Sequence, residues 1–191
     1  MRERKESVEM PARRLTTDEY FRTPESVLPQ ELIYGVLRAA DAPTPRHQSV
    51  LLDLTVALHA HVKALGLGRV WVAPVDVVLD AARALVVQPD LVYLSQTRLL
   101  EVSDRIRVAP DMVLEVLSPN PRIGHLDERL GWFAQYGVRE CWLVHQVERR
   151  LEIVAFEHRQ VAGRTVFFGT SPFRSAVLPQ FVGPLDALVE W

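Results

Sequence analysis

The sequence predicts an α/β (mixed α+β) domain in which a central mixed β-sheet is flanked by helices and preceded by an N-terminal hairpin. The first observation is hydrophobic periodicity: two segments repeat apolar residues at helical spacing, and the other apolar segments alternate or run continuously, as strands do. The second is the order of these segments, which is strands, a long helix, three strands, a second helix and three strands. That order favours one sheet with helices packed against it.

Length and composition favour one folded domain. The chain has 191 residues, 48% of them hydrophobic, which is enough for one core and short for two independent domains. Residues 1–14 are polar and mixed in charge, with Pro11 near their end, and are predicted to be a mobile arm. Residues 15–191 are predicted to be the single domain.

The N-terminal elements carry local signals. Thr16 and Glu19 have capping-box spacing and predict a short helix. Residues 31–38 predict two strands that turn at Tyr34-Gly35, where glycine accepts a positive φ. Pro45 precedes a long segment of helical periodicity that ends at Gly66.

The remaining helices and strands are predicted from changes in the spacing of apolar residues along the chain. Apolar runs predict strands, and the run after position 125 has helical spacing and stops at Gly137. The predicted strands are 69–79, 85–94, 112–117, 140–145, 150–156 and 165–168, and the predicted second helix is 126–136.

Charge and cysteine content limit the function classes. The formal net charge of -2 gives no global case for nucleic-acid binding, so any such contact must be local. Cys141 is the only cysteine, which excludes an intramolecular disulfide. The sequence shows no signal peptide and no apolar run of membrane-spanning length. We therefore expect a cytoplasmic protein.

Three carboxylates lie inside apolar strands. Asp76, Asp90 and Glu115 would each cost several kcal/mol on a buried strand unless paired, protonated or bound to a metal. Two such carboxylates facing one cleft can hold Mg²⁺, or Mn²⁺, with water and a substrate phosphate completing the shell. Each also fits a structural role, as a strand-end residue or as the partner of an arginine.

Six motifs in register resemble the Uma2 family, bacterial proteins placed with the PD-(D/E)XK nucleases. They extend over about residues 16–156, in the family's order and spacing. The motifs are Glu31-Leu-Ile-Tyr-Gly-Val-Leu, Pro45-Arg-His47-Gln, Ala73-Pro-Val-Asp-Val-Val-Leu79, Gln88-Pro-Asp90-Leu-Val, Pro110-Asp-Met-Val-Leu-Glu115-Val-Leu-Ser-Pro119 and Gly137-Val-Arg-Glu-Cys-Trp-Leu-Val144.

The resemblance implies a restriction-endonuclease-like fold with Asp90 and Glu115 as metal ligands. The usual lysine two residues beyond the second acid is replaced by Leu117. In this family the lysine is thought to come from the following helix, where Arg129 is the best match. Arginine keeps its charge, so it can position neighbouring groups or stabilise negative charge, but it is a poor proton acceptor.

Four further residues are candidates for supporting the site or binding substrate: Glu31, His47, Asp76 and His125. His47 opens the long helix, where it could contact a substrate phosphate or orient Glu31, or simply form local hydrogen bonds. His125 and Arg129 share a helix face, so both could reach the cleft; otherwise the pair is solvated. His125 stands where the family commonly has aspartate.

Two functional hypotheses follow. The first is a Mg²⁺-dependent DNA endonuclease. The second is a catalytically degenerate nuclease-fold domain that binds DNA or a protein partner. A homodimer fits either, because a nuclease of this type must often reach two strands.

Overall fold

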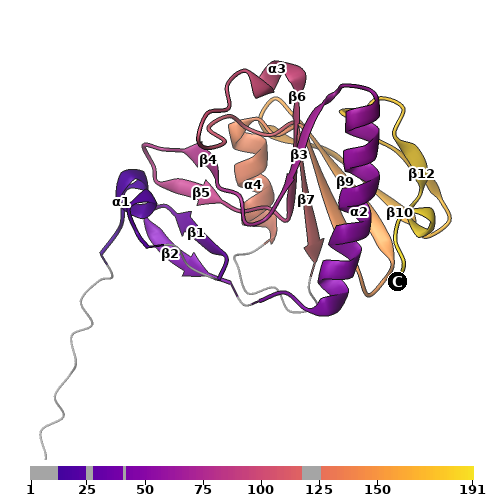
Figure 1. Ribbon diagram of the computed structural model, residues 1–191, viewed down its shortest axis with the longest axis horizontal. Coiled ribbons are helices and arrows are strands. Elements are labelled where there is room, and N and C mark those ends of the chain that lie inside the picture. The colour runs from indigo at the N-terminus through magenta and orange to yellow at the C-terminus, as the bar shows by residue number, and fades with distance from the viewer. Residues whose placement is uncertain (1–12, 25–27, 41, 118–125) are drawn as a thin grey trace, which may run out of the picture.

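The computed structural model describes residues 13–24, 28–40, 42–117 and 126–191. A six-stranded sheet with the order β10-β9-β8-β7-β6-β3 forms the centre (Figure 1). Strands β7 and β8 are parallel and the other neighbours are antiparallel, which makes the sheet mixed. The strands are β3 (Gly68–Val72), β6 (Leu91–Ser95), β7 (Met112–Leu117), β8 (Glu140–His145), β9 (Arg150–Glu157) and β10 (Gln160–Phe168).

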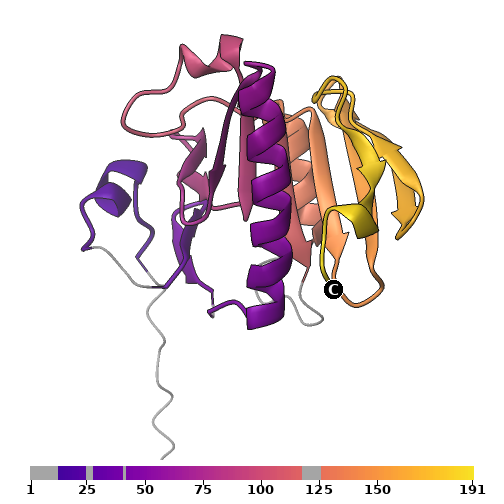
Figure 2. The ribbon, with the colours of Figure 1, turned by 45° about the vertical axis from the view of Figure 1, so that its right-hand side comes forward.

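The two long helices cover opposite faces of this sheet. Helix α2 (Pro45–Ala64) and helix α4 (Leu126–Tyr136) have the predicted positions, and Figure 2 shows α2 crossing the front of the sheet. Successive strand residues point to opposite faces. Leu114 accordingly belongs to the core beneath α2, and its neighbour Val113 packs in the core beneath α4. The predicted sheet flanked by helices is confirmed.

A smaller sheet with the order β2-β1-β5-β4 lies beside the first one and carries the N-terminal hairpin. The hairpin turns at Tyr34 and Gly35, whose φ values of 49° and 85° fit a tight two-residue turn. Thr16 and Glu19 form the predicted capping box. The elements are α1 (Thr17–Phe21), β1 (Gln30–Ile33), β2 (Val36–Ala39), β4 (Val77–Asp80) and β5 (Leu85–Val87).

Two predicted strands were wrong in the same way. Segments 69–79 and 85–94 each form two strands, and the two halves belong to different sheets. Pro74 and Pro89 lie in the breaks, and proline cannot donate to a β-ladder. The apolar runs looked continuous because apolar residues stand on both sides of each proline. These breaks place Asp76 and Asp90 where the chain crosses between the sheets.

The C-terminal part contains elements that the periodicity did not predict. Phe173, Leu178 and Leu185 pack in the core beneath α2. The predicted arm, residues 1–14, lies almost entirely outside the described residues, and the single domain over 15–191 stays a prediction. Within the described ranges, no helix has the length and apolar character needed to cross a membrane. The additional elements are α3 (Gln96–Leu99), β11 (Pro172–Arg174), β12 (Val182–Pro184) and a 3-10 helix (Leu185–Ala187).

Candidate active site

Asp90, the residue just before β6, lies opposite Glu115 of the neighbouring strand β7. Strands β6 and β7 pair with Leu91 facing Leu114, so the residue before β6 falls opposite Glu115. The backbone N–H of Val116 donates to Asp90 Oδ2 at 2.7 Å. The side chains of Asp90 and Glu115 are 21% and 13% exposed, so both carboxylates are mostly shielded yet open to solvent. The antiparallel register therefore brings the two predicted metal ligands together.

His47 contacts Asp90 from the first turn of α2. Its backbone N–H donates to the Thr44 hydroxyl that caps the helix, and its Nε2 lies 3.1 Å from Asp90 Oδ2. Burial disfavours the charged imidazole, but the hydrogen bond and negative charge of Asp90, helped by Glu115, raise the pKa of His47. His47 Nδ1 is buried and bonds no atom of the described residues. His47 thus orients Asp90 rather than Glu31.

Arg129 joins the two glutamates. From α4, its Nε donates to Glu115 Oε1 at 2.7 Å, and its Nη1 donates to both Glu31 oxygens at 2.8 and 2.9 Å. The side chains of Glu31 and Arg129 are 2% and 9% exposed. The planar guanidinium suits such bridging, because its donors form a fixed fork. Arg129 holds β1, β7 and α4 together.

When Glu115 is ionised and His47 is neutral, negative charge exceeds positive charge in this site. Burial raises the pKa of Glu115; Arg129 opposes this, but Asp90 and Glu31 reinforce it, and the pKa reaches about 7. The single positive charge of Arg129, which is shared between two glutamates, does not offset the negative charge of three carboxylates and the free energy needed to bury them. The site would therefore be stabilised by a further cation.

Asp76 does not join the other carboxylates. It accepts hydrogen bonds from the Tyr20 hydroxyl at 3.0 Å and from Gln88 Nε2 at 2.9 Å, and Arg105 pairs with it at 3.2 Å. The Gln88 backbone N–H in turn donates to Glu31 Oε1 at 2.7 Å. Asp76 thus supports the site through Gln88.

Sequence reasoning missed Gln88 as a site residue, although Gln88 stands in the motif that contains Asp90. Its side-chain amide and its backbone N–H connect two acidic residues from different strands. His125, another predicted candidate, lies outside the described residues.

The donor set fits a hard divalent cation. Mg²⁺ takes oxygen ligands and is commonly held by one or two carboxylates with water and substrate completing its shell. Asp90 and Glu115 supply two such carboxylates on adjacent strands. Across the described part of the chain, no cluster of three or more His, Cys, Asp or Glu residues has metal-holding geometry. The side chains described here therefore fit an open site better than a closed protein cage.

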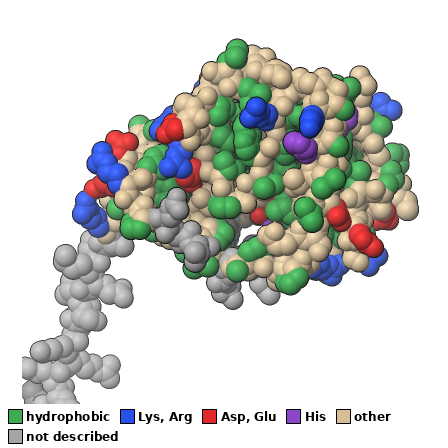
Figure 3. Space-filling view, in the orientation of Figure 1, with side chains coloured by type: hydrophobic (Ala, Val, Ile, Leu, Met, Phe, Trp, Pro, Cys, Tyr) green, Lys and Arg blue, Asp and Glu red, His purple; other side chains and the backbone are tan. Residues whose placement is uncertain are grey.

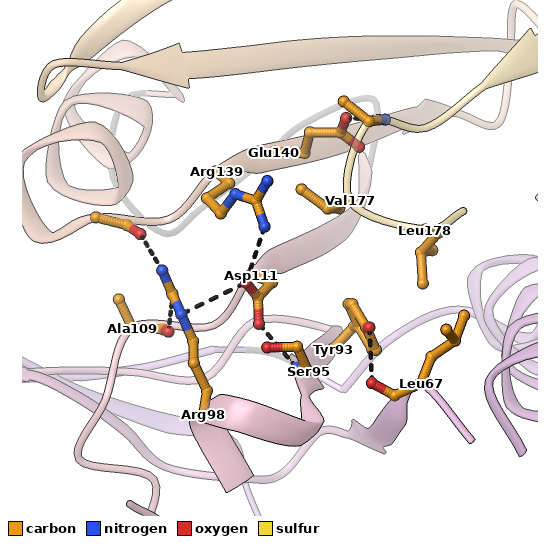
Figure 4. Close-up of polar contacts among 12 residues, drawn as sticks. Leu67, Tyr93, Ser95, Arg98, Ala109, Asp111, Arg139, Glu140, Val177 and Leu178 are labelled. Atoms are coloured by element: carbon orange, nitrogen blue, oxygen red, sulfur yellow. Dashed lines mark hydrogen bonds and ion pairs between the residues drawn. The ribbon is translucent and has the colours of Figure 1, made fainter. Parts of the chain in front are cut away.

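A second buried acid, Asp111, shows what a purely structural carboxylate looks like in this fold (Figure 4). Ser95 N–H donates to its Oδ2 at 2.8 Å, and Arg98 and Arg139 both approach its Oδ1 at 3.4 Å. Asp111 thus has two cations of its own. Glu115, four residues further along the chain in β7, shares one guanidinium with Glu31.

Comparison with known proteins supports this fold. A crystal structure described as "a putative nuclease belonging to DUF820 from Anabaena variabilis ATCC 29413" matches with a TM-score of 0.78. The match covers 91% of this chain and 97% of that chain at 17% sequence identity, which shows the fold alone. A search of curated proteins gave no match.

The comparison with family models identifies the family. The Uma2 family, described as "Putative restriction endonuclease", matches residues 17–186. This range includes all four acidic candidates and Arg129. The resemblance seen in the motifs is confirmed, and the chain belongs to the Uma2 family.

Proposed function

We propose that this protein is a DNA endonuclease that uses Mg²⁺ or Mn²⁺ to hydrolyse phosphodiester bonds. The observation that carries the proposal is the pairing of Asp90 with Glu115 across β6 and β7, in a site where carboxylates outnumber cations. The family description supports the same reaction class. A cytoplasmic homodimer fits this function, because two sites are needed to cut both strands of a duplex together.

The residues of the site would divide the work as follows. Asp90 and Glu115 would hold the cation, which when bound would lower the pKa of a coordinated water and offset charge on the attacked phosphate. His47 Nε2 orients Asp90, and Arg129 orients Glu115 while keeping its own positive charge. Glu31 and Gln88 fix Arg129 and the β1 side of the site.

One observation favours the alternative of a degenerate nuclease-fold domain that binds DNA or a protein partner. Arg129 is engaged by both glutamates and stays protonated, because their charges raise the pKa of its guanidinium against the effect of burial. Arg129 therefore cannot exchange a proton with water at neutral pH. A lysine at this position could do so if its pKa were lowered.

Mg²⁺ or Mn²⁺ is expected to raise the melting temperature of the wild type. A cation at ten times its dissociation constant stabilises the folded state by about 1.4 kcal/mol, which corresponds to a few degrees at this chain length. The variant Asp90→Ala, Glu115→Ala should show no such shift. Differential scanning fluorimetry with EDTA as the reference measures it, and equal shifts in the two proteins would exclude these residues as the ligands.

Cleavage of a DNA duplex by the wild type should require Mg²⁺ or Mn²⁺ and should be lost in Glu115→Ala. The informative comparison is Arg129→Lys, which keeps the charge and restores the residue type typical of the family. Gel assays of the three proteins, with folding checked by circular dichroism, separate the two functions. Metal-independent DNA binding without cutting, and no cutting by Arg129→Lys, would favour the degenerate domain.

A further inference from the structure

A basic groove lies between the N-terminal hairpin and α4. Its volume is about 480 Å³, and three arginines from distant parts of the sequence line it: Arg14, Arg38 and Arg83. Glu128 is the only acidic residue in its lining. The groove therefore has an excess of two positive charges, whereas the whole chain has a net charge of -2. Figure 3 shows basic and acidic side chains intermixed at the end with α1, β1 and β2, so the groove is a local feature.

The groove adjoins the carboxylate site. Arg38 on β2 stands opposite Glu31 on β1 in the backbone register, and residues opposite each other in an antiparallel pair point to the same face. Glu31 is bonded to Arg129, the neighbour of Glu128 on α4. At its other end the groove reaches the hairpin turn, whose Tyr34 ring packs edge-on against Trp132 of α4. One end of the groove thus lies beside the site and the other end lies at the turn.

No carboxylate lies within ion-pair distance of these three arginines in the described structure. Arg14 donates to the carbonyl of Tyr34 at 3.3 Å. The Arg83 guanidinium lies 4.7 Å from the centre of the Tyr34 ring, and its Nη1 donates to the Tyr136 hydroxyl at 3.4 Å. Arg38 has no hydrogen bond or ion pair with another described residue. By contrast, seven other arginines pair with carboxylates: Arg13, Arg98, Arg105, Arg129, Arg139, Arg150 and Arg164. Arg14 and Arg38 thus bring positive charge to the groove without an ion pair in the described structure, whereas Arg83 is connected to Asp80 through the Tyr136 hydroxyl.

We propose that this groove binds the phosphate backbone of duplex DNA and guides one strand toward Asp90 and Glu115. Guanidinium groups match phosphate oxygens in geometry and charge. From Arg38 to the turn the hairpin extends roughly 10 Å at about 3.3 Å per residue, which equals about three base-pair steps measured along the axis of a duplex. This assignment rests on the proposed nuclease function, and it identifies the surface on which the DNA substrate would lie.

The larger cavity, of about 600 Å³ beside Asp76, fits this ligand less well. Its Arg105 already pairs with Asp76 and stacks on Phe21, and Asp104 adds a second acid to the lining. Phosphate would have to compete with those carboxylates.

The test compares two triple variants in which equal charge is removed. Arg14→Gln, Arg38→Gln, Arg83→Gln removes the groove arginines. The matched control, Arg149→Gln, Arg159→Gln, Arg174→Gln, removes three exposed arginines in the C-terminal part of the chain. Binding of the full chain to a fluorescent 20-base-pair duplex is measured by anisotropy in EDTA, so that cleavage cannot occur, over a range of salt concentrations.

The groove variant is expected to bind at least tenfold more weakly than the wild type. Its plot of log affinity against log salt should be shallower by roughly 2.7, about 0.9 for each lost phosphate contact. The control should keep the wild-type slope, and both variants should keep the wild-type melting temperature. Equal losses in the two variants, an unchanged slope in the groove variant, or no binding by the wild type would overturn the groove assignment.

Failure of the groove and failure of the nuclease function give different results. If the groove variant binds DNA normally but metal still stabilises the site and cleavage occurs, only the groove assignment fails. If the groove variant loses DNA binding while the wild type neither gains stability from metal nor cuts, the groove stands and the nuclease function fails.

Discussion

Replacing Arg129 with methionine should destabilise the fold by about 3–5 kcal/mol, because removing one partner of a buried ion pair leaves uncompensated charge. Glu31 is buried, and Arg129 is the only cation bonded to it among the described residues. Glu115 would lose the same cation. At 2–4 °C per kcal/mol for a chain of this size, the melting temperature should fall by roughly 10 °C. Thermal unfolding followed by circular dichroism measures the change.

Two variants separate this effect from a general loss of charge. Arg164→Met removes an exposed arginine that pairs with Glu152 and Asp127 at 3.3 Å, and should cost no more than about 1 kcal/mol. Arg129→Met combined with Glu31→Gln should recover part of the lost stability, because the buried negative charge is then absent. A single Arg129→Met variant that melts within 2 °C of the wild type would show that the ion pair contributes little.

The sequence predicted the helices better than the strands, for a physical reason. The helix over 126–136 and the hairpin turn at Tyr34-Gly35 are set by residues a few positions apart, and both agree with the structure. The strands at 69–79 and 85–94 were each predicted as one, because apolar periodicity reports burial and not which sheet a strand joins. Pro74 and Pro89 were the available signals for the two breaks.

The sequence could predict the site residues that neighbouring strands bring together. It could not predict the contacts between residues far apart in the sequence. The resemblance to the Uma2 family pointed to Asp90 and Glu115 together, and antiparallel pairing does bring them opposite each other. The bond between Arg129 and Glu31 joins residues 98 positions apart, so no local pattern could reveal it. The roles of Gln88 and of the unpaired groove arginines likewise appear only when β1, β2 and α4 are placed together.

The stabilisation by Mg²⁺ should depend steeply on pH, with the change centred near the Glu115 pKa of about 7 in the protein without metal. A carboxyl must be deprotonated to bind the cation, so proton and metal compete. Below its pKa the apparent affinity falls about tenfold per pH unit, which gives roughly a 30-fold loss between pH 8 and pH 5.5. Melting temperatures with and without Mg²⁺, measured across this range, report the difference.

Without metal, the contribution of Glu115 to folding stability changes with pH in the opposite direction. The folded-state pKa of Glu115 lies above its usual 4.5, so the folded state holds the proton more tightly than the unfolded chain. This group's contribution to stability is complete below about pH 4.5 and is lost as the pH rises through 7. Glu115→Gln should remove that decline together with the Mg²⁺ effect.

Among the described residues, His47 also faces this site, and its pKa is raised as well. His47→Gln removes its titration and leaves Glu115 in place. If the Mg²⁺ effect keeps its pH dependence in this variant, Glu115 is the group that competes with the metal. If the dependence disappears, the proton is held by the imidazole beside Asp90, and metal binding is then controlled by the charge of His47 rather than by the protonation of Glu115.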